Sequence, residues 1–372
     1  MKNNKMTKLL PLVVAMGVST QAMAAITLYD QNDTTFSVDG LFNTFYVNSQ
    51  SEGASEQDQA RIKMGFLPNV IGFNFGKQVD GLKLGGRSSF WVSINDTDPQ
   101  RDASAADAGT GSLIDVRQFY ATVDGDFGQV LVGKDFALFN RSNILGDEIL
   151  LGFGQTMTTG DDGGNVSFGN IGTGYLYPFP NSQITYRTPD MGGLNVAVGL
   201  MDPAKRSAAS EESSPRIEAE ASYAFTNDGF SGKGWLGAMS QKSKLAGDEL
   251  SSSGVSYGLN LKAAGLSLTA SGFKAKGVGA AGLGHLLTVD GAEVDGKLIQ
   301  LSYTMGAERF VLSSGKNDGG TTDGGSELDL ENKTAAIFHS VNSNLTLVGE
   351  FDKAESGDNS IKTIALGAVV TF

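Results

Sequence analysis

The chain ends on "IALGAVVTF" (364–372), a stretch that alternates between two kinds of side chain up to its last residue. One parity holds the larger apolar residues Ile364, Leu366, Ala368, Val370 and Phe372. The other parity is smaller and slightly more polar. Alternation with a period of two is typical of a β-strand whose two faces meet different surroundings. Because chain ends usually fray in water, this ending indicates a terminus that is held within a sheet.

The same alternation recurs along the chain in short segments: 194–201, 216–225, 255–262, 297–304 and 345–352. Two kinds of separator alternate strictly between such segments. One kind is a short Gly, Asn or Asp cluster of hairpin size: 79–82, 124–128, 190–193, 227–234, 263–265, 306–308 and 342–344. The other is longer, polar and mostly acidic: 49–59, 95–112, 140–181, 202–214, 241–253, 275–295, 316–331 and 352–359. Seven short turns and eight long loops predict 16 strands.

This layout gives the sheet one plain end and one elaborated end, as in outer-membrane barrels. We therefore predict an all-β fold, a 16-stranded antiparallel transmembrane β-barrel with short periplasmic turns and long outer loops. An even strand number places both termini at the short-turn end. The last strand must then pair with the first, "FSVDGLFNTFYV" (36–47), because an open sheet edge is untenable in a bilayer.

A soluble sandwich also alternates, since one of its faces meets a core and the other meets water. Two observations favour the barrel. Aromatic residues lie near segment ends, as an interfacial girdle requires, and the second face is small and polar, which leaves little to fill a second core. These aromatic residues are Tyr223, Phe225, Tyr303, Phe310 and Phe372. A solenoid would show a fixed repeat period, and the separator lengths here vary widely.

Residues 1–24 have the three parts of a secretory signal peptide: Lys2, Lys5 and Lys8, an apolar run, and a closing A-x-A. We expect a mature barrel domain over 25–372, with no transmembrane helix in it. The chain has no cysteine, which excludes thiol catalysis, Cys-ligated zinc and iron–sulfur clusters. The net charge of −13 becomes more negative still without the three leader lysines, and this disfavours nucleic acid.

The sequence does not favour an enzyme, a cofactor or a metal site. Its two histidines are His285, in a Gly-rich loop, and His339, whose neighbour Ser340 would point to the opposite face of a strand. "GVGAAG" (277–282) lacks the helix and the acidic partner of a dinucleotide site. The acidic outer loops lack EF-hand spacing, so we interpret them as solvated charge.

Three stretches and the terminus resemble the Gram-negative trimeric general-diffusion porins. They are "NVIGFNFGKQVDGLKLG" (69–85), "DVRQFYATVDGDFGQVLVGKDFALFN" (115–140), "NSQITYRTPDMGGLNVAVGL" (181–200) and Phe372. The resemblance implies a homotrimer in the outer membrane, surrounded by lipid and lipopolysaccharide, with one pore per protomer. Small hydrophilic solutes and ions would cross it by passive diffusion. Phe372 would be the signal that barrel assembly reads.

In this family the third loop folds inward, and its acids face basic residues on the wall. By position, the resemblance assigns Arg117 and Arg187 to that wall. Parity adds four more inward cations: Arg61, Lys63, Lys83 and Arg87. A charge on the lipid face would cost ~2–4 kcal/mol at the midplane, so the lumen is the cheaper place. Where porins often carry an arginine before "GF", this chain has Val70. Scattered lumen charge without a shared function is the alternative.

The constriction loop is expected over 140–181. In "NRSNILGDEILLGFGQTM" (140–157) the only acids are Asp147 and Glu148, followed by three apolar residues. We expect those apolar residues to pack on the wall and the two carboxylates to project into the pore. A solvated outer loop is the alternative.

The runner-up function is a substrate-selective outer-membrane channel for sugars or carboxylates. An aromatic track would favour sugars, and Trp91 and Phe119 are the visible inward aromatics. A basic lumen favours anions, whereas acidic outer loops attract cations to the mouth. Ion preference therefore stays open at this point.

Overall fold

The structure is a computed structural model that describes residues 25–53, 56–95, 114–154, 167–205, 208–278, 293–319 and 329–372. The expected signal peptide (1–24) and His285 lie outside these residues. None of the helices in the described ranges is both long and apolar enough to cross a membrane.

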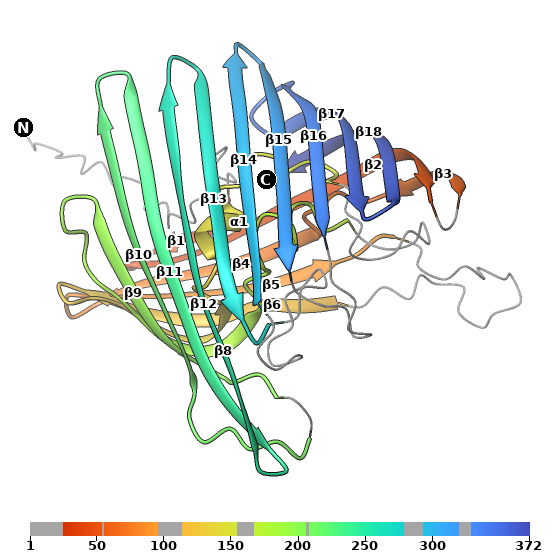
Figure 1. The fold of residues 1–372 in the computed structure, drawn as a ribbon. Coiled ribbons are helices and arrows are strands. Elements are labelled where there is room, and N and C mark those ends of the chain that lie inside the picture. Colours follow the sequence, from red (N-terminus) through yellow and green to blue (C-terminus); the bar gives the residue numbers. More distant parts are fainter. Residues whose placement is uncertain are drawn as a thin grey trace, which may run out of the picture.

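Strands dominate the described residues, with one short helix among them (Figure 1). In chain order the elements are β1 (Ile26–Gln31), β2 (Thr34–Glu52), β3 (Gln57–Lys63), β4 (Asn69–Val79), β5 (Leu82–Val92), β6 (Ile114–Gly125), β7 (Gly128–Phe136), α1 (Arg141–Leu145), β8 (Pro180–Arg187), β9 (Leu194–Met201), β10 (Arg216–Asn227), β11 (Phe230–Leu245), β12 (Asp248–Ala263), β13 (Leu266–Lys276), β14 (Glu293–Met305), β15 (Glu308–Gly319), β16 (Leu330–Ser340), β17 (Leu345–Ser356) and β18 (Asn359–Thr371).

These strands form a closed antiparallel barrel whose wall has 16 positions. β3 and β4 both pair with the same edge of β2, so together they occupy one position. β1 forms a hairpin with the start of β2 and extends the position of β18. From β4 to β18, each strand pairs with the next along the chain. The predicted fold class is confirmed.

The barrel closes where β18 pairs with β2, in a register that runs from Ser360↔Glu52 to Thr371↔Leu41. The seam continues to the last residue, because Gly40 N donates to Phe372 O at 2.8 Å and Phe372 N donates to Gly40 O at 3.1 Å. The Phe372 ring lies where a Cβ on residue 40 would be, so a larger residue there would have to displace the ring. The last strand pairs with β2, which contains the segment 36–47 predicted as its partner.

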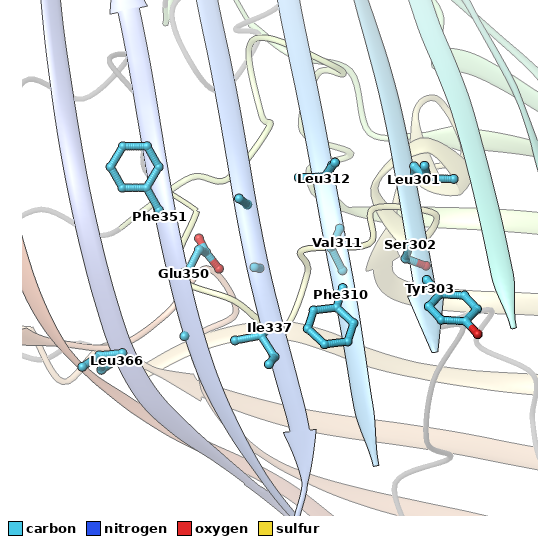
Figure 2. A pocket seen from close by; sticks show the side chains of 13 residues that line it. Leu301, Ser302, Tyr303, Phe310, Val311, Leu312, Ile337, Glu350, Phe351 and Leu366 are labelled. Carbon is cyan, nitrogen blue, oxygen red and sulfur yellow. The ribbon is translucent and has the colours of Figure 1, made fainter. Parts of the chain in front are cut away.

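The apolar parity of β18 faces outward. Ile364, Leu366 and Val370 are 51%, 59% and 42% exposed, whereas Ala365 and Val369 are buried on the inner face. Neighbouring strands continue this outer apolar surface. Figure 2 shows a shallow groove in it over β14–β18, surrounded by Tyr303, Phe310, Ile337, Phe351 and Leu366. A continuous apolar outer band is what a lipid-facing barrel surface requires.

Two of the expected long loops are instead tight turns. β11 and β12 pair out to Leu245↔Asp248, so 241–253 is mostly strand around Ala246 and Gly247. Both turn residues have positive φ, at 52° and 97°, as a two-residue hairpin turn requires. β17 and β18 likewise pair out to Ser356↔Asn359. Polar sequence was interpreted as loop here, but a strand that continues beyond the membrane has water on its outer face and can be polar.

The segment 137–179 between β7 and β8 is called here the inserted loop. It carries α1, and its described residues, 137–154 and 167–179, lie inside the barrel (Figure 1). Its described parts pack on the inner faces of β13–β18 and β2, called here the covered wall. The wall side of this contact is apolar: Leu41, Phe45, Phe273, Leu298, Val311, Phe338 and Val348. The expectation that little remains for a second core is therefore wrong, because the inserted loop supplies the partner for an apolar inner face.

Candidate functional site

The inserted loop is tied to the barrel wall along most of its described length. Trp235 Nε1, on β11, donates to Asn143 Oδ1 at 2.8 Å, and Asn143 Nδ2 donates to Gly272 O at 3.0 Å. These bonds hold α1 against β11 and β13. On the return course, Asn317 and Asn332 donate to backbone carbonyls of the loop. The loop is thus a fixed partition inside the barrel.

Asp147 lies on this loop with its carboxylate turned to the covered wall. It accepts hydrogen bonds from Tyr175 Oη at 2.6 Å, Gln300 Nε2 at 2.6 Å and Asn170 Nδ2 at 3.0 Å. The side chain is buried. Burial raises the pKa of the Asp147 carboxyl above its usual value, and the hydrogen bonds from these three partners oppose that rise. Asp147 thereby joins the two arms of the loop to β14.

Glu148 is also buried and also faces the covered wall. Its carboxylate lies 3.0 Å from Arg309 Nη1 and accepts from Ser267 Oγ at 2.7 Å. The Arg309 guanidinium in turn stacks on Phe338, 4.1 Å from the ring centroid. Neither of these two acids presents its carboxylate to open water, which differs from the expectation that both project into the pore. The reason is that β13–β15 place hydrogen-bond donors where the loop touches them.

Buried glutamates of the wall hold the loop's backbone. Glu218 Oε2, on β10, accepts from the backbone N–H groups of Leu138 at 2.7 Å and Phe139 at 2.8 Å. Glu350, on β17, accepts from the backbone N–H groups of Phe153 and Gly154 at 3.1 and 2.5 Å. The sequence analysis missed this role. Their inward parity was visible, but nothing in the sequence indicated that their partners would be loop amides.

The predicted basic residues lie on the inner face but do not form one ladder. Arg87, on β5, makes a two-pronged ion pair with Asp39, with Nη1 at 2.6 Å and Nη2 at 2.9 Å from its oxygens. Its Nε donates to Gln118 Oε1 at 2.9 Å. Lys63 is buried against the loop, 5.8 Å from the Phe153 ring centroid.

Two other predicted cations are less enclosed. Arg61 on β3 and Lys83 near the start of β5 are half-buried. Val70, on β4, is buried inward in the apolar cluster under the loop. This position therefore serves packing against the loop and carries no charge.

Arg117 faces the lumen through a β-bulge. The register slips between Ser89 and Phe90, so that Arg117 and Gln118 both lie on the inner side and Phe119 points outward, 63% exposed. Strict alternation would place Gln118 on the face opposite to Arg117 and Phe119 inward. Both placements are wrong, because alternation takes no account of the extra residue.

The Arg117 guanidinium lies between aromatic rings. It is 4.9 Å from the ring centroid of Trp91 and donates to Tyr177 Oη at 3.0 Å. Its Nε is 2.7 Å from Asp115 Oδ2. Since Tyr177 belongs to the inserted loop, this contact connects the returning arm of the loop to β5 and β6.

Arg187 lies on the inner face of β8, and Ile184 and Tyr186 are exposed on its outer face. Two further cations near it were not identified from the sequence, Arg141 on α1 and Lys233 on β11. Arg141 Nη1 is 3.2 Å from Asp135 Oδ2. Among the described residues, no group of three or more His, Asp or Glu side chains could hold a metal ion.

A family model described as "Gram-negative porin" matches residues 12–359 of this chain. Its fold is similar to the anion-selective porin from Comamonas acidovorans, with TM-score 0.67, 15% identity, and 91% of this chain and 100% of that chain covered. It is also similar to Salmonella typhi OmpF in complex with daunomycin, with TM-score 0.62, 14% identity, and coverage of 93% and 100%.

A third similar structure is the trimer form of in-vitro folded OmpT, an outer membrane protein of Vibrio cholerae. Its TM-score is 0.57 at 12% identity, with 92% of this chain and 100% of that chain covered. At sequence identities of 12–15%, the similarity to these structures shows the barrel fold alone. No curated protein matches the chain in sequence.

Proposed function

The chain belongs to the Gram-negative porin family, and on that premise we propose how its pore is built and what crosses it. It is an outer-membrane channel for passive diffusion. We propose that small hydrophilic solutes and ions are its cargo. Catalysis is not part of the proposal, because the family is one of channels.

The observation that carries the proposal is that the middle of the inserted loop, residues 143–153, packs on one side of the barrel, while its two arms touch β6, β9 and β10. The loop contacts the covered wall through buried residues such as Ile149 and Phe153. The inner faces of β5–β10, called here the open wall, carry polar and charged side chains that include Arg87, Gln118 and Arg187. A water-filled passage between the loop and the open wall follows from this arrangement.

We assign the constriction to the loop and the open wall together. Asp147 and Glu148 act on it by fixing the loop's position through their bonds to Gln300 and Arg309. Arg87, Arg117 and Arg187 supply positive charge from the opposite side, with Lys83 near the short-turn end. Arg61 and Lys63, on β3, complete the basic set beside the loop.

We also propose a homotrimer with one pore in each protomer. The trimer form of the similarly folded OmpT supports this assembly. Outer-membrane lipid and lipopolysaccharide would cover the remaining apolar outer surface. Phe372, which closes the barrel seam against Gly40 and stacks on Phe42 at 5.7 Å, would be the assembly signal. Residues 1–24 would direct export and be cleaved.

A planar-bilayer recording of the refolded protein tests the channel and the trimer together. The proposal expects current steps that arrive and close in groups of three equal levels. Folded protein that inserts without conducting would overturn the channel. Single independent steps would remove the trimer and leave the channel in place.

A substrate-selective channel is the second candidate. The placement of Arg117 between Trp91 and Tyr177 supports it, because a ring pair flanking a cation can guide a planar or carboxylate-bearing solute. Liposome swelling with sugars of increasing size distinguishes the two. Rates that fall smoothly with size support general diffusion, whereas one sugar that exceeds smaller ones supports selectivity.

A further inference from the structure

Near the start of α1, two lumen-facing cations lack an ion-pair partner among the described residues. They are Arg187 on β8 and Lys233 on β11. Four other arginines of the inner face each lie close to a carboxylate: Arg87, Arg117, Arg216 and Arg309. An unpaired cation in a polar lumen keeps its charge available to a passing ion.

Both cations approach the start of α1. Lys233 Nζ is 3.4 Å from Ser142 Oγ, next in the chain to Arg141. The Ser142 backbone N–H donates to Glu220 Oε2 at 3.3 Å, so Glu220 lies at the same place. Arg187 is in the same cross-strand row as Glu220, with only Ala197 of β9 between them. The backbones of Arg187 and Glu220 are therefore two strand spacings apart, roughly 10 Å, and both side chains point inward.

The acids at this place are withdrawn from the lumen, whereas the cations are not. Glu220 and Asp135 are 6% and 1% exposed, and Arg187 and Lys233 are each half-buried. Asp135 accepts from Gln118 Nε2 at 2.9 Å and pairs with Arg141. Water in the passage is therefore in contact with the cationic groups of Arg187 and Lys233 rather than with the carboxylates of Glu220 and Asp135.

Within the described part of the loop the acids do not offset this charge, since Asp147 and Glu148 are buried against the covered wall. The net charge of the chain, −13, would by itself attract cations to the mouth. Preference inside the pore is decided by the charges closest to the ion, because salt screens the distant ones within about 8–10 Å.

We propose that Arg187, Lys233 and Arg141 form an anion subsite where the inserted loop leaves the open wall, and that the pore consequently prefers small anions to small cations. This inference rests on the proposed channel function. The ligand class is a small anion with one or two negative oxygens or a halide, and chloride is the probe.

The test is the reversal potential in a tenfold KCl gradient, measured on single channels of the wild type, Arg187→Gln, Lys233→Gln and the double variant. Each lost charge should lower the chloride-to-potassium permeability ratio about twofold, the size of water-screened attraction at roughly 8 Å. Lys233→Arg should restore the wild-type ratio. Lys242→Gln is the matched control, because Lys242 lies on the outer side of the same strand, paired with Glu249.

A double variant whose permeability ratio equals that of the wild type would overturn the subsite. So would a Lys242→Gln shift as large as that of Lys233→Gln, since the effect would then come from overall charge. In both cases the channels still conduct, so the proposed porin function would stand. Absence of any conductance in the wild type would instead remove the function itself.

Discussion

The covered wall and the open wall are built from strands of the same alternating pattern, yet their inner faces differ. The covered wall buries Phe273, Leu298 and Phe338 beneath the inserted loop. The open wall places Arg87, Gln118 and other polar groups on its inner face. In a soluble protein an inward face implies a core. In this barrel the inner face forms a core only where the loop covers it, and the rest of the inner face borders water.

The two walls should therefore respond differently to substitution. Changes under the loop should alter its position, and so conductance and current noise. Changes on the open wall should alter ion preference while the loop stays in place.

The largest effect is expected from Phe153→Ala under the loop. Phe153 is fully buried and tilted against Phe45 at a centroid distance of 6.1 Å. Its truncation should cost about 3–5 kcal/mol of local packing and loosen the loop. Single-channel recording should show a larger or fluctuating conductance. Phe119→Ala, on the outer face, is the control and should conduct as the wild type does.

Glu350→Gln should have a smaller effect of the same kind. The amide keeps the shape of the side chain but loses the charge that accepts N–H groups of Phe153 and Gly154. Hydrogen bonds to a charged group contribute about 1.5–3 kcal/mol. We expect added open-channel flicker at unchanged mean conductance. Glu355→Gln, on the outer side of β17, should leave the noise as it is, and equal noise in both variants would contradict the loop contact.

Asp115→Asn should have the smallest energetic effect and act only on selectivity. Asp115 pairs with Arg117, but its side chain is 54% exposed, so loss of the pair should cost about 0–1 kcal/mol. The uncovered Arg117 charge should move the reversal potential towards chloride without altering flicker. Asp80→Asn, in the exposed turn after β4, is the charge-matched control. A change of current noise in Asp115→Asn would contradict the claim that substitutions on the open wall alter ion preference alone.

Much of the barrel could be predicted from the sequence, because the bilayer imposes alternation and turns on every strand. The seam between β18 and β2 follows from the need to leave no edge. The outer ends of β11 and β12 could not be predicted in the same way. Outside the membrane a strand loses its apolar face, and its sequence then resembles that of a loop.

The site was less predictable for two physical reasons. A single extra residue in the bulge at Arg117 reverses the parity of Gln118 and Phe119, and periodicity does not record it. The destination of a loop side chain depends on tertiary contacts, so the wall partners of Asp147 and Glu148 could not be inferred from spacing. Val70 and Lys63 show the same limit, since inward parity did not reveal that the loop would cover them.

The central claim is that the middle of the loop covers one wall, and that the other wall, which the loop touches only through its two arms, lines the passage. Thiol accessibility tests it most directly, because the chain has no cysteine of its own. In single-channel recordings, a water-soluble methanethiosulfonate should reduce the current of Gln129→Cys, on the inner face of β7 beside Arg187, and leave Ala336→Cys unaffected. Equal modification of both, or of Ala336→Cys alone, would contradict the account.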